Sequence, residues 1–153
     1  MKIITGRASA LLQAPQRDCF AMLADIEAYP RWAGDLVTGV DVLERDASGM
    51  ASQALLRLYV RQSPVVRNFE LRAAVMTRPP DAVRLSRLPR DAADQDRLEL
   101  MWSLSRPRET RLELSFHAEM SSLPSVVPLF GVGDAIADHL VDRVRSAVSR
   151  ERS

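Results

Sequence analysis

The sequence predicts an α+β domain in which a seven-stranded curved antiparallel sheet surrounds one long C-terminal helix, with two short helices after the first strand. Three observations lead to this fold class. Seven segments alternate between apolar and polar residues, two short segments after the first of them have helical spacing, and the chain closes with a long amphipathic stretch. The 153 residues suit a single domain, which we expect to span 1–153, and a hydrophobic content of 46% is ordinary for a globular protein.

The charge pattern argues against several classes of partner. The net charge is +1, and no run of lysine or arginine predicts binding to nucleic acid or to an anionic membrane. No apolar stretch reaches the roughly 18 residues that would span a bilayer, and the first residues lack the apolar core of a signal peptide. The single cysteine, Cys19, excludes an intrachain disulfide. We therefore expect a cytoplasmic protein without stable membrane insertion.

Residues 3–13 are predicted to form the first strand, because small and apolar side chains share one of its faces. That face carries Ile4, Ala8, Ala10 and Leu12. Its small residues would let a helix or a ligand approach closely. Pro15 suits the first turn of a short helix. The apolar side of that helix is expected to comprise Phe20, Leu23 and Ala24, and a second short helix is expected around Ile26 to Ala33.

Six more strands are predicted after Gly34, separated by turns that are rich in proline, glycine and aspartate. Their apolar faces are formed in order by Val40 and Val42; Ala54, Leu56, Leu58 and Val60; Phe69, Leu71, Ala73 and Val75; Val83 and Leu85; Leu98, Leu100, Trp102 and Leu104; and Leu112, Leu114, Phe116 and Ala118. Polar residues occupy the positions between them. This alternation is typical of an antiparallel sheet with one face against the core and the other in solvent.

The long helix is predicted from about Val126 to Arg150. Its apolar stripe consists of Leu129, Ile136, Leu140, Val144 and Ala147, widened by Ala137, Val141 and Val148. Acidic residues come early and arginines late on the opposite side, which suits the helix dipole. At about 30 Å, this helix is the only long element available to cover the apolar face of the sheet.

The element order and the stretch from Phe20 to Gly34 resemble the START/Bet v 1-like (SRPBCC) superfamily, most closely its bacterial polyketide cyclase/dehydrase or coenzyme Q-binding-like branch. Members carry a phenylalanine, an aspartate and a Tyr-Pro-x-Trp group after the first strand. Here the corresponding residues are Phe20, Asp25, Tyr29, Pro30 and Trp32. The resemblance covers essentially the whole chain and implies a helix-grip fold with a cavity for an apolar ligand. It implies much less about function, because the superfamily includes lipid carriers, quinone-binding proteins, aromatase/cyclases and stress proteins.

The inward-facing rows contain no Asp, Glu or His, which favours a binding protein over a catalyst. A cyclase needs a proton acceptor and a proton donor beside the reacting carbon atoms. We therefore predict that the domain binds a small apolar ligand, such as a lipid, a quinone or a polyketide-like molecule, between the sheet and the C-terminal helix. The predicted ligand-binding residues are Trp32, Leu56, Leu58, Phe69, Leu71, Trp102, Leu104, Phe116, Phe130, Ile136, His139 and Leu140.

The position of the ligand is also predicted. Ala8 and Ala10 face larger residues of later strands, and we expect this asymmetry to leave an open pocket that Ala10→Phe would block. Polar anchors are expected at the mouth, near Trp32, Arg87 or His139. For Trp32 the favoured interpretation is nevertheless packing of the short helices against the sheet. For His139 it is a partly exposed residue without a ligand role.

Two other functions remain open. A β-bulge that reversed the parity of the third strand would bring Arg57 and Tyr59 into the cavity. These two residues are weak catalytic candidates for an aromatase/cyclase, or polyketide cyclase/dehydratase, that acts on a polyketide intermediate. Alternatively, the domain is a protein-interaction module or a homodimer without a ligand. An exposed patch could then be formed by Leu11, Leu43, Leu55 and Met101.

No metal or cofactor is expected. His117, His139 and Cys19 lie far apart in the sequence, without the spacing of a metal site. The segment from Gly131 to Asp134 resembles a phosphate-binding loop only superficially, because no strand directly precedes it. We interpret its glycines as part of the start of the long helix.

Overall fold

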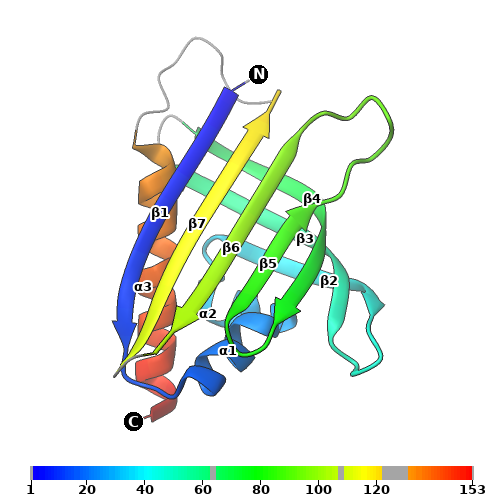
Figure 1. The fold of residues 1–153 in the computed structure, drawn as a ribbon. Helices are drawn as coiled ribbons and strands as arrows, with labels where there is room; N and C mark the ends of the chain where they lie inside the picture. The colour runs from blue at the N-terminus through cyan, green and yellow to red at the C-terminus, as the bar shows by residue number, and fades with distance from the viewer. Residues whose placement is uncertain (1, 63–64, 107–108, 122–130, 153) are drawn as a thin grey trace.

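We analysed a computed structural model of the chain, which describes residues 2–62, 65–106, 109–121 and 131–152 (Figure 1). The elements are β1 (Lys2–Leu12), α1 (Gln16–Ala24), the one-turn 3-10 helix η1 (Ile26–Ala28), α2 (Tyr29–Ala33), β2 (Val37–Arg45), β3 (Ala51–Gln62), β4 (Val65–Arg78), β5 (Ala82–Arg87), β6 (Arg97–Ser105), β7 (Thr110–Met120) and α3 (Val132–Arg152). The predicted α+β fold is therefore confirmed, with its seven strands, the short helices after the first strand and the long last helix.

The strands form one antiparallel sheet in the order β1-β7-β6-β5-β4-β3-β2. Figure 1 shows the sheet curling around α3, so that β1 lies along one side of the helix while β2, β3 and β4 turn behind it. The short helices lie at the end of the curl where α3 ends. The sheet and α3 thus enclose a common interior.

The strand β3 keeps the alternation that the sequence predicts. Its register with β2 shifts between Val37 and Gly39, where Val37 pairs with Leu58 and Gly39 with Arg57. The extra residue of this irregularity therefore lies in β2, whereas β3 pairs with β4 residue by residue. Because the parity of β3 is not reversed, Arg57 stays on the outer face of the sheet.

The helix α3 begins at Val132, later than the predicted start at Val126. The segment 122–130, which includes Leu129, lies outside the described residues. Gly131, just before the helix, has a φ of +78°, a left-handed conformation that favours glycine. The predicted apolar stripe is buried at Leu140, Val144 and Ala147, and also at Ala137, Val141 and Val148.

The first turn of α3 packs directly against the backbone of β1. A Cβ atom on Gly133 would lie 1.8 Å from the carbonyl oxygen of Thr5, and one on Gly6 would lie 2.2 Å from that of Gly133. Next to this contact, the backbone N–H of Arg7 donates a hydrogen bond to Asp134 Oδ1 over 3.0 Å. The two glycines therefore allow a separation that any side chain would prevent. We call this contact the helix–β1 seam.

Candidate ligand-binding site

A cavity of about 120 Å³ lies between the sheet and α3. Every strand contributes to its wall, together with Tyr29 of α2, Leu36 of the α2–β2 loop and two residues of α3. Eight of the twelve predicted ligand-binding residues are among those that line it, namely Leu56, Leu58, Phe69, Leu71, Trp102, Phe116, Ile136 and Leu140. The predicted inward rows therefore meet around one enclosed space.

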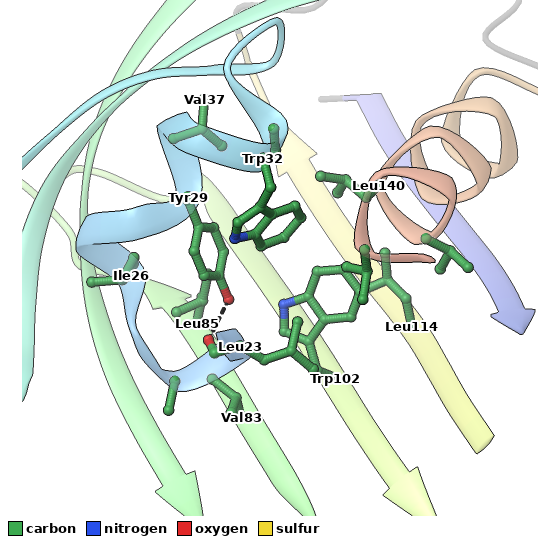
Figure 2. Close-up of a cluster of buried hydrophobic side chains, with 14 of the residues drawn as sticks. Leu23, Ile26, Tyr29, Trp32, Val37, Val83, Leu85, Trp102, Leu114 and Leu140 are labelled. Carbon is green, nitrogen blue, oxygen red and sulfur yellow. Dashed lines mark hydrogen bonds between the residues drawn. The ribbon is translucent and has the colours of Figure 1, made fainter. Parts of the chain in front are cut away.

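The wall of this cavity is almost free of polar atoms. Among the described lining residues, only Tyr29 and Trp102 carry a side-chain nitrogen or oxygen. The Tyr29 hydroxyl donates a hydrogen bond to the carbonyl oxygen of Leu23 over 2.6 Å (Figure 2). Burial raises the pKa of Tyr29 well above its usual value, so this hydroxyl stays protonated at neutral pH. It therefore cannot serve as a general base there.

The indole nitrogen of Trp102 is buried and has no hydrogen-bond partner among the described residues. Figure 2 shows this nitrogen turned towards the Tyr29 hydroxyl, but the two groups do not meet hydrogen-bond geometry. The Tyr29 hydroxyl and the Trp102 indole therefore place polar groups, but no formal charge, beside the cavity.

Trp32 lies beside the cavity, in an aromatic cluster with Tyr29 and Trp102. Its ring centroid is 4.7 Å from that of Tyr29 and 6.2 Å from that of Trp102, both at tilted angles that favour aromatic pairs. Trp32 is 6% exposed and packs α2 against the sheet, in line with the structural interpretation favoured above. Of the other predicted residues, Leu104 is buried outside the cavity wall, and Phe130 lies outside the described residues.

A second, polar hollow of about 470 Å³ adjoins the cavity, and we call it the portal hollow. Its lining residues are Gly34, Asp35, Leu36, Thr38, Tyr59, Val60, Arg61, Gln62, Ile136 and His139. It forms where β3 continues beyond Leu58, its last residue paired with β2, and passes α3. Three residues, Leu36, Val60 and Ile136, line both spaces. They make the boundary between the apolar cavity and its polar neighbour.

An ion-pair cluster joins the rim of the portal hollow to α3. His139 Nε2 lies 2.6 Å from Asp35 Oδ2, and Arg143 donates to the same oxygen over 2.8 Å. Burial would raise the pKa of Asp35, but the hydrogen bonds and charges of Arg143 and His139 outweigh it and hold this pKa below its usual value. Asp35 is therefore ionised at neutral pH and ties the α2–β2 loop to the helix. We call this cluster the Asp35 latch.

The weak catalytic candidates lie outside the apolar cavity. Arg57 is on the outer face of the sheet, where its Nη1 lies 2.5 Å from Asp41 Oδ2 and its side chain is 44% exposed. Tyr59 lines the portal hollow. The expected anchor Arg87 is 8% exposed and is held by both carboxylate oxygens of Asp94, outside the lining of either space. No guanidinium group of the described residues reaches the cavity wall.

The apolar residues considered for a protein interface do not gather in one place. Leu11 and Leu43 are 56% and 47% exposed, but they belong to β1 and β2, which are the opposite edges of the sheet. Leu55 and Met101 are half-buried on the inner strands β3 and β6. The four residues therefore do not make a continuous patch.

Several residues of the site could not be predicted from the sequence pattern. Leu36 sits in a loop without periodicity, and Asp35 meets His139, which is 104 positions away in the sequence. Within the described part of the chain, no group of three or more His, Cys, Asp or Glu residues is arranged to hold a metal. None of the described helices combines the length and apolar character needed to cross a membrane.

Comparison with known proteins places these features in a family. Residues 12–145 match the sequence profile of the family described as polyketide cyclase/dehydrase and lipid transport. No curated protein sequence matches the chain significantly.

Several solved structures share the fold at low sequence identity. A START superfamily protein from Mycobacterium smegmatis is 18% identical, with a TM-score of 0.78 over 96% of this chain and 98% of that one. The Zhui aromatase/cyclase from Streptomyces sp. R1128 is 13% identical, with a TM-score of 0.72 over 99% and 97% of the two chains. Major latex-like protein 151 from Panax ginseng is 11% identical, with a TM-score of 0.68 over 97% of each chain. At such identities the likeness concerns the fold alone.

Proposed function

Because the chain belongs to the polyketide cyclase/dehydrase and lipid transport family, we propose that it binds a small apolar ligand in the cavity between the sheet and α3. The observation that carries this proposal is the apolar wall, whose described residues offer a ligand hydrophobic contact and no charged group. Burial of apolar surface gains about 25 cal/mol per Å². A cavity of this kind recognises its ligand by shape and apolar area.

The size of the cavity limits the ligand that it can hold without rearrangement. An apolar cavity of about 150 Å³ accommodates benzene, whereas ordinary ligand pockets measure about 300–1,000 Å³. At about 120 Å³, the cavity suits a ring of benzene size or a short alkyl chain. A longer acyl chain, a quinone tail or a polycyclic ligand requires that the side chains move or that the ligand continue into the portal hollow.

The portal hollow offers the natural continuation of the ligand. It shares Leu36, Val60 and Ile136 with the cavity, so displacement of these side chains joins the two spaces. We infer that the ligand enters between β3 and α3. The Asp35 latch lies at the rim of this route.

The aromatase/cyclase alternative has less support from the site. Ring closure of a polyketide by an aldol-type step requires a group that accepts a proton and one that donates it. The described cavity wall contains no carboxylate, histidine or arginine side chain, and the Tyr29 hydroxyl is engaged by Leu23. Arg57, the first catalytic candidate, faces the opposite side of the sheet.

A chain-length series of primary alcohols from hexanol to hexadecanol tests the proposal by calorimetric titration. Each methylene buried adds about 0.8 kcal/mol, so the affinity should rise roughly fourfold per carbon until the available space is filled. The length at which this rise stops measures the occupied volume. A plateau at six to eight carbons indicates the closed cavity, and a later one indicates that the chain continues into the portal hollow.

Ala118→Leu supplies the matched blocking variant, because Ala118 lines the cavity and is 4% exposed. The larger side chain should weaken the binding of every alcohol by at least tenfold. The control is Ser146→Ala on the exposed side of α3, which should bind like the wild type. The proposal fails if no alcohol binds, or if the affinity is independent of both chain length and Ala118→Leu.

A further inference from the structure

Arg61 lies at the mouth of the apolar cavity and has no carboxylate partner among the described residues. It follows Val60 on β3, and the two side chains lie on opposite faces of that strand. Val60 lines both the cavity and the portal hollow, while Arg61 lines the hollow alone. None of the ion pairs among the described residues includes Arg61. Its guanidinium group is therefore available to a ligand whose apolar part fills the cavity.

The remaining charges of the portal hollow leave that positive charge unbalanced. Among the described residues, the single carboxylate in its lining is Asp35, and both Arg143 and His139 already contact the same oxygen of that carboxylate. With Arg143 included, two guanidinium groups and one carboxylate give a net charge of +1 even when His139 is neutral. The hollow thus favours an anion over a neutral or cationic group.

Two further hydrogen-bond donors line the same hollow. The Tyr59 hydroxyl and the Gln62 amide have no hydrogen-bond partner among the described residues, whereas the Thr38 hydroxyl is engaged by the carbonyl oxygen of Arg57. A planar guanidinium group with neighbouring donors matches the oxygen atoms of a carboxylate or a phosphate. Beyond the boundary residues, the described part of the cavity wall offers no such donors apart from the Tyr29 hydroxyl and the Trp102 indole.

We propose that the ligand is an amphiphile, with an alkyl or small ring portion in the cavity and an anionic head group held by Arg61 in the portal hollow. This inference rests on the proposed function and names the chemical class of its ligand. Two kinds of head group, a carboxylate and a phosphate monoester, share the chemistry that Arg61 recognises.

Four probes with the same eight-carbon chain test the head group by calorimetric titration at pH 7 and low ionic strength. They are octanoate, octyl phosphate, octan-1-ol and octylammonium. Octanoate or octyl phosphate should bind about threefold to fivefold more tightly than octan-1-ol, the range expected for an exposed ion pair. Octylammonium should bind less tightly than the alcohol. The advantage of the anion should shrink at 0.5 M salt, because salt screens exposed charges.

Arg61→Gln is the decisive variant, and Arg57→Gln is its matched control. Both arginines belong to β3 and point away from the cavity, but Arg57 is paired with Asp41 and lies outside the portal hollow. Arg61→Gln should abolish the advantage of the anions and leave the affinity for octan-1-ol unchanged. Arg57→Gln should change neither quantity.

The outcomes separate this inference from the proposed function. If octan-1-ol binds as tightly as both anions, or if Arg61→Gln leaves the anion advantage intact, the head-group assignment is wrong while apolar binding stands. An equal loss for octan-1-ol in Arg61→Gln would show a structural role for Arg61 and also overturn the assignment. If no probe binds, the proposed function itself fails. An advantage confined to octanoate or to octyl phosphate supports the assignment and identifies the source of the anion.

Discussion

The two sides of α3 meet the sheet in opposite ways. On the side of β1, Gly6 and Gly133 bring the helix against the strand, and Gly133 approaches the carbonyl oxygen of Thr5 so closely that no Cβ would fit. On the side of β3, large side chains such as Leu58 and Ile136 keep the helix away from the strand. The cavity is lined by every strand, and on this second side it adjoins the portal hollow.

Empty space in this fold arises where α3 and the facing strand stay apart. Small residues do not leave a void at the helix–β1 seam, because the helix moves in and fills it. On the other side, large side chains such as Leu58 and Ile136 line a space that the backbones of β3 and α3 do not close. A close-packed interior tolerates few voids, so a lasting one needs walls that are held apart. The curled sheet, which contacts α3 at the helix–β1 seam, keeps the walls of the cavity apart.

Breaking the seam should have the largest effect. Gly133→Ala places a methyl group where the Thr5 carbonyl oxygen lies, and backbone atoms cannot rotate away as a side chain can. We expect a loss of about 3 kcal/mol in the free energy of unfolding, the upper range for overpacking. The gain in helix propensity from glycine to alanine, about 1 kcal/mol, is smaller and does not compensate. Urea unfolding followed by circular dichroism measures the loss.

Gly131→Ala provides the matched control for that prediction. No atom of the described residues lies within 4 Å of a Cβ at Gly131, so this variant loses only the cost of a left-handed alanine, about 1 kcal/mol. If the two variants were equally stable, the close approach at the seam would not contribute to folding.

Substitution of leucine for two alanines, one at the filled side and one in the cavity, should have effects of intermediate size on stability. Ala10→Leu adds volume on β1 against the hydrophobic core, outside the cavity wall, and should destabilise the fold by about 1–3 kcal/mol. Ala118→Leu adds the same volume on β7 into the cavity, and should keep or raise the melting temperature while ligand affinity falls. Thermal unfolding of the two purified proteins, with and without octan-1-ol, measures both effects. Equal destabilisation by the two substitutions would contradict the distinction between a filled and an open side.

The smallest effect should come from the Asp35 latch, which crosses the open side. Asp35 is 42% exposed, so Asp35→Asn should lower the free energy of unfolding by less than about 1 kcal/mol at pH 7. The folded-state pKa of Asp35 is lowered, so its stabilisation is fully present above the unfolded-state pKa and is lost as the pH falls through the folded-state value. The gap between wild type and variant in urea titrations should therefore close as the pH drops from about 5 towards 2. A gap that persists at the acid end would exclude Asp35 ionisation as its origin.

Local patterns in the sequence account for the architecture and for most of the cavity wall. Alternation with period two places Leu56 and Leu71 on the inner face of the sheet wherever the strands lie in space, because side chains of a strand point to opposite faces in turn. The same rule places Arg57 on the outer face of the sheet, because the extra residue of the register shift between Val37 and Gly39 lies in β2 and not in β3. The amphipathic spacing of α3 likewise selects Ile136 and Leu140 as residues of its buried face.

Only the tertiary structure decided which inward residues border empty space. Leu104 shares its inward row with Trp102, yet it lies beyond the cavity, and Ala8 and Ala10, expected beside a pocket, lie outside the cavity wall on the strand that meets the helix at the seam. The portal hollow forms where β3 extends beyond its pairing with β2, beside α3. The Asp35 latch joins Asp35 to His139, which is far away in the sequence. Periodicity reports the face on which a residue lies, whereas a void depends on how closely two backbones approach. That distance is set by contacts between segments far apart in the sequence, such as Gly6 with Gly133.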